Sequence, residues 1–260
     1  MLLFLLSLVF AESYTAPRRG TVVAVYDGDT FTLNTGDKIR LLGVNTPELK
    51  PREDYGIEAR DAATSLLLNK RVTLSYGDVK KDGYGRLLAS VKQGEVDTAV
   101  YLLEKGLGHV FLIPPDSLDK DALLETQKKA REANKGLWRT EPYQASLHIT
   151  SFHANSPGND SQNLNGEYLR VCNISQESIN IKGYYITNAQ KHSFVFPDVA
   201  IPAGHTFKIR SGSGTHQNDS SKQLEIFLFS RYPVWNNSYD KATIYSPEGL
   251  VQDSRSHKKK

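Results

Sequence analysis

The hydrophobic pattern of the first half of the chain alternates between strand-like runs and helical segments. Apolar and β-branched residues alternate with polar ones in TVVAVYDGDTFTL, KIRLLGV and RVTLSY, and RLLASV and EVDTAV follow later. Alanines and leucines recur at helical spacing over residues 57–70, and two further helices are expected over 98–105 and 119–134. We therefore expect an α+β domain over residues 17–142, a five-stranded barrel with three helices packed outside it.

After residue 142 the helical periodicity ends. Short alternating runs such as LHITSFHA, EYLRVCNI and TFKIRSG, separated by turn signals, are typical of an antiparallel β-sandwich. We expect an all-β, immunoglobulin-like sandwich over residues 147–253. The chain ends in three lysines, and residues 254–260 are expected to form a mobile basic tail.

Composition narrows the class of protein only a little. The 260 residues suit two domains, and 39% hydrophobic with 23% charged residues excludes wholesale disorder and a multi-pass membrane protein. One cysteine excludes a disulfide within the chain and a zinc site built on cysteines. Residues 12–144 hold 20 basic and 20 acidic residues, so the net charge of +3 arises after them. Bulk charge therefore does not mark the first half as a nucleic-acid binder.

The N-terminus predicts export. Residues 1–10 read MLLFLLSLVF, about half of the ~20 residues that cross a bilayer, and Val9 and Ala11 suit a cleavage site. We expect a signal peptide over residues 1–11 and a secreted or cell-surface protein with no stable membrane span. The segment lacks a basic residue before its apolar run, so a misplaced start, a short anchor or a buried strand remains the alternative.

Three segments of the first half carry charged residues in unusual places. Asp27 and Asp29 stand in one turn, Arg40 stands within an apolar run, and Glu48 follows a proline. Arg86 begins a strand directly after a Gly-Tyr-Gly turn. Asp-Gly alone is a common hairpin turn, but a charge among apolar residues is costly unless it faces a partner or a ligand.

Together these residue types suit metal-assisted hydrolysis of a phosphodiester. A divalent cation prefers carboxylate and carbonyl oxygens, which are offered by Asp29, Asn45 and Thr46. Glu48 is the candidate to orient or deprotonate an attacking water. The forked guanidinium groups of Arg40 and Arg86 suit the oxygens of the phosphate.

The segments DGDT, RLLGVNTPE and YGR resemble the staphylococcal nuclease (thermonuclease) family over residues 21–138. The resemblance implies an OB-type barrel and a calcium-dependent nuclease that cuts DNA and RNA, preferably single strands. By motif position it makes Arg40, Glu48 and Arg86 the catalytic residues. It places the metal on Asp29, Asn45 and Thr46, with Asp27 supporting the turn or a metal ligand.

Two departures from the family pattern affect the site. Asn45 stands where the family has aspartate, so one charge is lost and weaker calcium binding, or another divalent cation, is expected. The segment GHVFLIPP stands where the family has tyrosines that hold the nucleotide. Phe111 is then a candidate stacking face, with a buried aromatic as the alternative, and Tyr84 is a candidate phosphate contact.

Residues 147–253 resemble the lamin-tail domain, through segments such as NGEYL, IKGYYI and IPAGH. No catalytic set of residues appears there, and the six histidines of the second half of the chain show no paired metal spacing. The sandwich is expected to have a binding or targeting role, and the sequence does not identify its ligand. The leading hypothesis is a secreted calcium-dependent nuclease, and the alternative is a barrel that binds single-stranded nucleic acid without cutting it. Pure surface adhesion would leave the charged residues of the first half unexplained.

Overall fold

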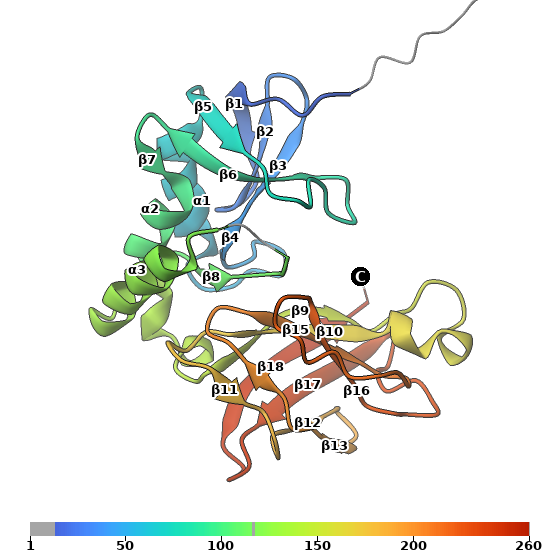
Figure 1. The fold of residues 1–260 in the computed structure, drawn as a ribbon. Coiled ribbons are helices and arrows are strands. Elements are labelled where there is room, and N and C mark those ends of the chain that lie inside the picture. Colours follow the sequence, from blue (N-terminus) through green and yellow to red (C-terminus); the bar gives the residue numbers. More distant parts are fainter. Residues whose placement is uncertain (1–13, 116–117, 260) are drawn as a thin grey trace, which may run out of the picture.

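A computed structural model describes residues 14–115 and 118–259 as two domains packed against each other (Figure 1). The predicted signal peptide, residues 1–11, lies outside the described residues. No helix within the described ranges combines the length and the apolar character that crossing a membrane requires. We call residues 19–143 the barrel domain and residues 147–258 the sandwich domain.

The barrel domain is built on a sheet that closes on itself. Across the sheet its strands are β3 (Lys38–Leu41), β2 (Thr30–Leu33), β1 (Arg19–Val25), β5 (Arg71–Ser75), β6 (Leu87–Gln93) and β7 (Val96–Asp97). An additional parallel pairing of β3 with β6 closes the sheet into a barrel. The two-residue β7 pairs only with the end of β6, in an antiparallel hairpin. Alternate residues of β5 and β6 point into a common core, which explains their period-two pattern. The predicted five-stranded barrel is confirmed.

Three helices cover the barrel: α1 (Gly56–Leu67), α2 (Thr98–Glu104) and α3 (Lys120–Glu132). The aspartates that precede α2 and α3 cap them, since Asp97 accepts hydrogen bonds from Ala99 and Val100, and Asp119 accepts one from Ala122. Helix α1 ends before the predicted residue 70 because Leu68 is extended and Asn69 takes a positive φ of 61°. Two short 3₁₀ turns, Gly136–Arg139 and Glu141–Tyr143, lead to the next domain.

The sandwich domain has two four-stranded sheets. The first is β16 (Leu224–Phe227), β15 (Thr206–Arg210), β10 (Tyr168–Asn173) and β9 (Leu147–His153). The second is β13 (Ser193–Val195), β12 (Tyr185–Thr187), β17 (Tyr239–Tyr245) and β18 (Val251–Lys258). A small pair, β11 (Ile179–Asn180) with β14 (Ala200–Ile201), lies beside them. Buried apolar residues fill the space between the sheets, as the predicted immunoglobulin-like sandwich requires.

The prediction of a mobile tail over residues 254–260 is wrong for residues 254–258. They belong to β18, which pairs with β17 in antiparallel register up to Tyr239↔Lys258. The run SRSHK lacks an apolar pattern because its inward contacts are polar. Arg255, for example, donates to the carbonyl of Ile149 at 2.9 Å and pairs with Glu53. The sandwich therefore extends beyond Asp253.

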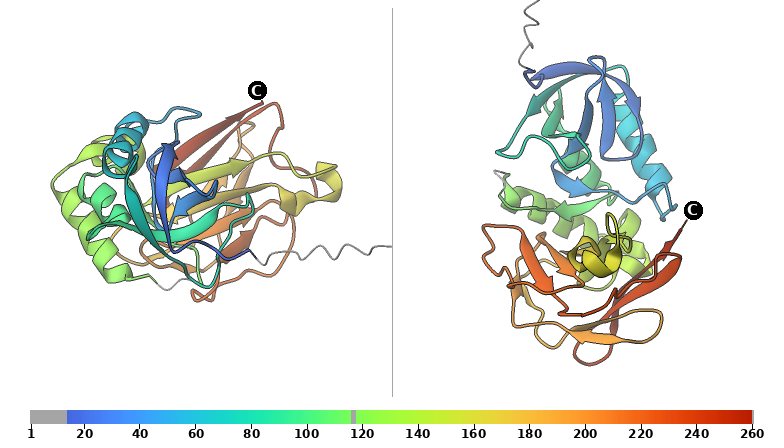
Figure 2. Two further views of the ribbon diagram at one scale, coloured as in Figure 1. Left: turned by 90° about the horizontal axis from the view of Figure 1, so that it is seen from above. Right: turned by 90° about the vertical axis from the view of Figure 1, so that its right-hand side faces the viewer.

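One face of the first sandwich sheet lies against the barrel domain. A short sheet of β4 (Gly43–Asn45) and β8 (His109–Phe111) lies between them, as Figure 1 shows, and Figure 2 shows the two domains stacked from two further sides. The hydroxyl of Thr206 donates to the carbonyl of Leu112 at 3.1 Å, and the thiol of Cys172 donates to the carbonyl of Val110 at 3.3 Å. These contacts orient the sandwich relative to the barrel.

Candidate active site

Asp29 is the centre of a buried hydrogen-bonded set at the start of β2. One of its carboxylate oxygens lies 3.1 Å from Nε of Arg40, and the other accepts hydrogen bonds from the backbone N–H and the hydroxyl of Thr46, at 2.8 and 3.0 Å. The pairing Thr30↔Arg40 between β2 and β3 places the arginine beside the turn. The barrel thus brings together three of the residues that the sequence singled out.

The turn before Asp29 is held by Asp27. A side-chain oxygen of Asp27 accepts a hydrogen bond from the backbone N–H of Asp29 at 3.0 Å, as in an Asx turn. A Cβ on Gly28 would lie 2.6 Å from the side chain of Thr46 and 2.9 Å from that of Ala59, so only glycine lets the turn pack this closely. Asp27 therefore supports the turn that presents Asp29.

Arg40 is buried and already uses most of its donors. Its Nη1 donates to the carbonyls of Leu41 and Val44, at 2.6 and 2.8 Å, and its Nη2 donates to Oδ1 of Asn45 at 2.9 Å. With the Asp29 contact of Nε, four of the five N–H groups of the guanidinium have acceptors. A bidentate grip on a phosphate by Arg40 would require it to release one of these partners.

Arg86 has fewer hydrogen-bond acceptors than Arg40. Its Nε lies 2.7 Å from Oδ2 of Asp82, and its Nη1 donates to the hydroxyl of Thr30 at 3.2 Å. The hydroxyl of Thr30 in turn donates to Asp29 at 3.1 Å. Thr30 thus links Arg86 to the hydrogen-bonded set around Asp29. Three of its N–H groups have no acceptor among the described residues. Arg86 is therefore the arginine that can grip a phosphate with a fork.

Glu48 lies at the edge of this set and faces a groove between the domains. The groove has a volume of about 900 Å³ and is lined by Glu48 from the barrel domain and by His153 and Arg255 from the sandwich domain. Burial raises the pKa of the Glu48 carboxyl, and the neighbouring carboxylates of Asp29 and Glu53 add to the effect. Such a group is a stronger base than an ordinary carboxylate when it is ionised.

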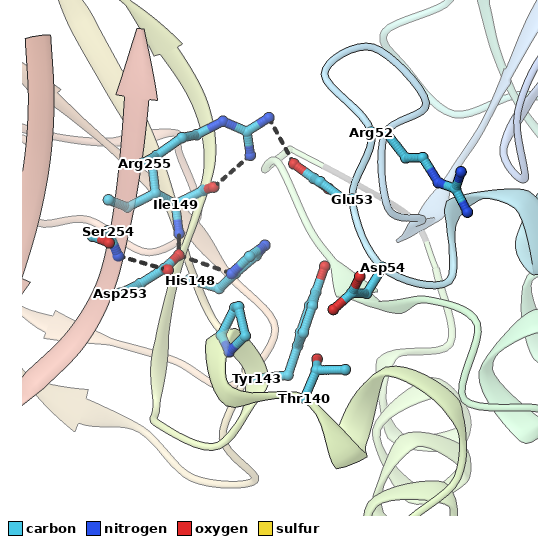
Figure 3. A pocket seen from close by; sticks show the side chains of 11 residues that line it. Arg52, Glu53, Asp54, Thr140, Tyr143, His148, Ile149, Asp253, Ser254 and Arg255 are labelled. Carbon is cyan, nitrogen blue, oxygen red and sulfur yellow. Dashed lines mark hydrogen bonds and ion pairs between the residues drawn. The ribbon is translucent and has the colours of Figure 1, made fainter.

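The loop that carries Glu48 is tied to the sandwich domain through Glu53. Oε2 of Glu53 accepts a hydrogen bond from the backbone N–H of Glu48 at 2.8 Å, and Oε1 lies 2.9 Å from Nη2 of Arg255. Figure 3 shows Glu53 and Arg255 pointing toward each other across a smaller pocket of about 260 Å³. On its far side, Asp253 pairs with His148 at 2.9 Å. Sequence reasoning missed this link because residues 254–258 of β18, which include Arg255, were expected to be a tail.

The oxygen atoms around Asp29 suit a hard divalent cation. Burial raises the pKa of Asp27 to about 7, and the charge of Asp29 adds to this effect. Across the described ranges, no group of three or more His, Cys, Asp or Glu is arranged to hold a metal. A cation here would rely on the Asp29 carboxylate with carbonyl, amide and water oxygens, which calcium and magnesium accept. The residues therefore fit such an ion.

Asn45 belongs to a hydrogen-bonded network that sequence reasoning missed. Its Oδ1 accepts from Arg40, and its Nδ2 lies 3.5 Å from Nε2 of His109. Nδ1 of His109 lies 2.9 Å from the carbonyl of Val110 and donates to it, which leaves Nε2 as an acceptor. Burial lowers the pKa of His109 to about 3, so the ring is neutral at pH 7. The only sequence signal was a lone histidine among apolar residues.

The two aromatic candidates each flank an arginine. The Phe111 ring centroid lies 5.7 Å from Cζ of Arg40, and that of Tyr84 lies 5.5 Å from Cζ of Arg86. Tyr84 is 74% exposed, whereas Phe111 is half-buried. Tyr84 is thus available to a ligand on the side of Arg86.

Comparison with known proteins finds two family models along this chain. Residues 38–140 match the staphylococcal nuclease homologue family, and residues 140–259 match the lamin tail domain. The chain is 35% identical over 124 residues to a thermonuclease of Staphylococcus hyicus, and the match spans 45% of this chain and 73% of that protein. It is 34% identical over 137 residues to a thermonuclease of Staphylococcus intermedius, with 50% and 78% covered. An uncharacterized endonuclease of Escherichia coli is 33% identical over 124 residues, with 46% and 76% covered.

Proposed function

Because the chain belongs to the family of staphylococcal nuclease homologues and carries a lamin tail domain behind that region, we propose that it is a metal-dependent nuclease that hydrolyses phosphodiester bonds. One observation carries the proposal. Three separate segments bring Asp29, Arg40 and Thr46 into one set that Thr30 links to Arg86, with Glu48 facing an open groove beside them. This set has the base and the phosphate clamp that the reaction needs.

The chain's own groups divide the chemistry among them. Arg86 donates its free N–H groups to the phosphate, and Arg40 adds its one remaining donor, so charge that develops on the phosphate oxygens is stabilised. Glu48 orients a water and takes its proton as the new P–O bond forms. The bond to the leaving oxygen breaks, and that oxygen takes up a proton from solvent water. A calcium or other divalent cation on Asp29, Asn45 and Thr46 would supply further positive charge to the phosphate.

The substrate is proposed to be single-stranded DNA and RNA. Exposed Tyr84 beside Arg86 supports this, because an aromatic ring next to a phosphate contact suits an unpaired base. The apolar segment over residues 1–11 supports export, with cleavage after Ala11. N-terminal sequencing of the secreted protein tests this part, and an intact Met1 would contradict it.

The proposed activity is tested by incubating residues 12–260 with labelled single-stranded DNA and RNA. We expect cleavage with calcium or another divalent cation and none with excess chelator, because the carboxylates beside Arg40 need a cation as partner. Binding without cleavage under every divalent metal would contradict the proposal and would favour the non-catalytic barrel.

Restoring a carboxylate at position 45 should strengthen cation binding. We expect Asn45→Asp to lower the calcium concentration for half-maximal cleavage by about ten-fold, because ligand charge sets affinity at such sites. The variant also loses the N–H that faces Nε2 of His109, so the free energy of unfolding without metal should fall by about 1–2 kcal/mol.

Adding His109→Gln to Asn45→Asp provides the matched control. The glutamine amide places a donor where Nε2 stood, so chemical denaturation should show part of the lost stability regained. An unchanged calcium requirement in both variants would contradict the assignment of position 45 to the cation.

A further inference from the structure

The sandwich domain contributes one wall of the groove that Glu48 faces. Residues of β9 and β18 line this groove opposite the loop of residues 48–52. Figure 3 shows the Arg255–Glu53 ion pair, which joins this wall to the Glu48 loop. Glu53 in turn accepts a hydrogen bond from the backbone N–H of Glu48. The wall is therefore part of the site rather than a separately moving attachment.

An aromatic stack continues this wall away from Glu48. His153, which lines the groove, stacks on Tyr168 with ring centroids 4.2 Å apart and 19° between the rings. Tyr168 stands opposite His153 in the register of β9 and β10. Burial raises the pKa of Tyr168, and the charge of Tyr84 adds to this effect. The stack thus extends the groove wall from β9 onto β10.

Cations surround the stack on the same sheet face. Leu169 and Val171 of β10 point into the sandwich core, so Tyr168 and Arg170 point outward, and alternation places Lys208 and Arg210 of β15 on that outer face. Nζ of Lys208 lies 5.3 Å from the Tyr168 ring centroid, and Cζ of Arg210 lies 5.8 Å from it.

Two of the cations on this face, Lys208 and Arg210, share one acid. Glu225 accepts two hydrogen bonds from Arg210, at 3.0 and 2.8 Å, and lies 3.6 Å from Nζ of Lys208. Burial lowers the pKa of Lys208, and the charges of Arg170 and Arg210 lower it further. An additional anion would relieve this repulsion, so the cluster is complementary to a phosphate.

We propose that one part of the outer face of the β9–β10–β15–β16 sheet, formed by His153, Tyr168, Lys208 and Arg210 beside the contact with the barrel domain, is the second wall of the substrate groove and binds single-stranded nucleic acid. Lys208 and Arg210 contact backbone phosphates, and the Tyr168–His153 stack provides a platform for a base. Rings interleaved with cations on a continuous path are what a single strand needs. An acidic peptide would use the cations and leave the stack without a role. The path of the bound nucleic acid toward Glu48 rests on the proposed nuclease function.

The test is binding by the full chain in the Glu48→Gln background with chelator present. The probe is a fluorescent oligothymidylate of about 15 nucleotides, which covers one single-strand site. We expect Tyr168→Leu with Lys208→Gln to raise Kd about ten-fold or more and to reduce the salt slope by about 0.7, the loss of one phosphate contact. Lys208→Gln alone, which leaves the stack in place, should give a smaller loss and checks the result if the double variant melts early.

The opposite sheet offers a matched control. Tyr185 stacks on Tyr245 at 4.8 Å, and Lys241 is exposed on the same strand as Tyr245, so Tyr185→Leu with Lys241→Gln removes groups of the same kinds from the other sheet. This control should leave Kd unchanged. An equal loss in both double variants, or equal competition by polyglutamate and oligothymidylate, would overturn the proposal.

Cleavage by chains with Glu48 intact separates the two proposals. If long single-stranded DNA is cut and the Tyr168→Leu, Lys208→Gln variant keeps its KM, the proposed nucleic-acid binding by the sandwich domain is contradicted, whereas the proposed nuclease activity is supported. If no DNA is cut but the variant still loses binding, the proposed nuclease activity is contradicted, whereas the proposed nucleic-acid binding by the sandwich domain is supported.

Discussion

Replacing Glu48 with glutamine is expected to lower kcat on single-stranded DNA by about 10²–10⁴-fold, the usual contribution of a general base. Glutamine keeps the size of the side chain but cannot take a proton from water. Glu48 faces the groove and its backbone N–H, not its side chain, holds Glu53, so the fold should persist. Binding of an oligonucleotide should change by no more than about two-fold, because the phosphate clamp remains.

The control for this variant is Glu58→Gln, an exposed glutamate on α1. It should keep full activity. The pH profile of kcat/KM adds a second measurement. Because burial raises the pKa of Glu48, activity should fall with decreasing pH at a higher pH than for an ordinary carboxylate, since the base is lost when it is protonated. Activity of the Glu48→Gln variant within about five-fold of the unmodified chain would contradict the role of Glu48.

Arg86→Lys is expected to lower kcat/KM by about 10²–10³-fold with little change in stability. The Arg86 side chain is 28% exposed, and a lysine can still pair with Asp82, so the melting temperature should hold within a few degrees. What lysine lacks is the planar fork, and three free N–H groups of Arg86 make that fork available to phosphate. Activity and melting curves on the same preparation check both parts.

Arg40→Lys provides the comparison, because the guanidinium group of Arg40 makes more hydrogen bonds within the protein than that of Arg86. Lysine cannot replace the bonds of Arg40 to Leu41, Val44, Asn45 and Asp29, so the free energy of unfolding should fall by about 1–3 kcal/mol for the unpaired groups. A stable Arg40→Lys chain that loses more activity than Arg86→Lys would reverse the assignment of the clamp.

Much of the fold was predictable because the patterns that encode it are local. Period-two alternation in β5 and β6, helical spacing in α1 and capping aspartates before α2 and α3 each depend on neighbours within a few residues. The candidate site followed from residue types in unusual places, since a buried arginine such as Arg40 needs a partner. Asp29 is that partner.

The sequence by itself determined two domains, their folds and the residues with the chemistry of a nuclease. Only the tertiary structure decided that Arg86 has more free donors than Arg40, that His109 holds Asn45, and that β18 continues as a strand beyond Asp253. It alone placed Tyr168 and Lys208 beside His153, which lines the groove of Glu48. The physical reason is common to all four. Each depends on contacts between residues far apart in the chain, such as Arg255 with Glu53, which leave no periodicity in the sequence.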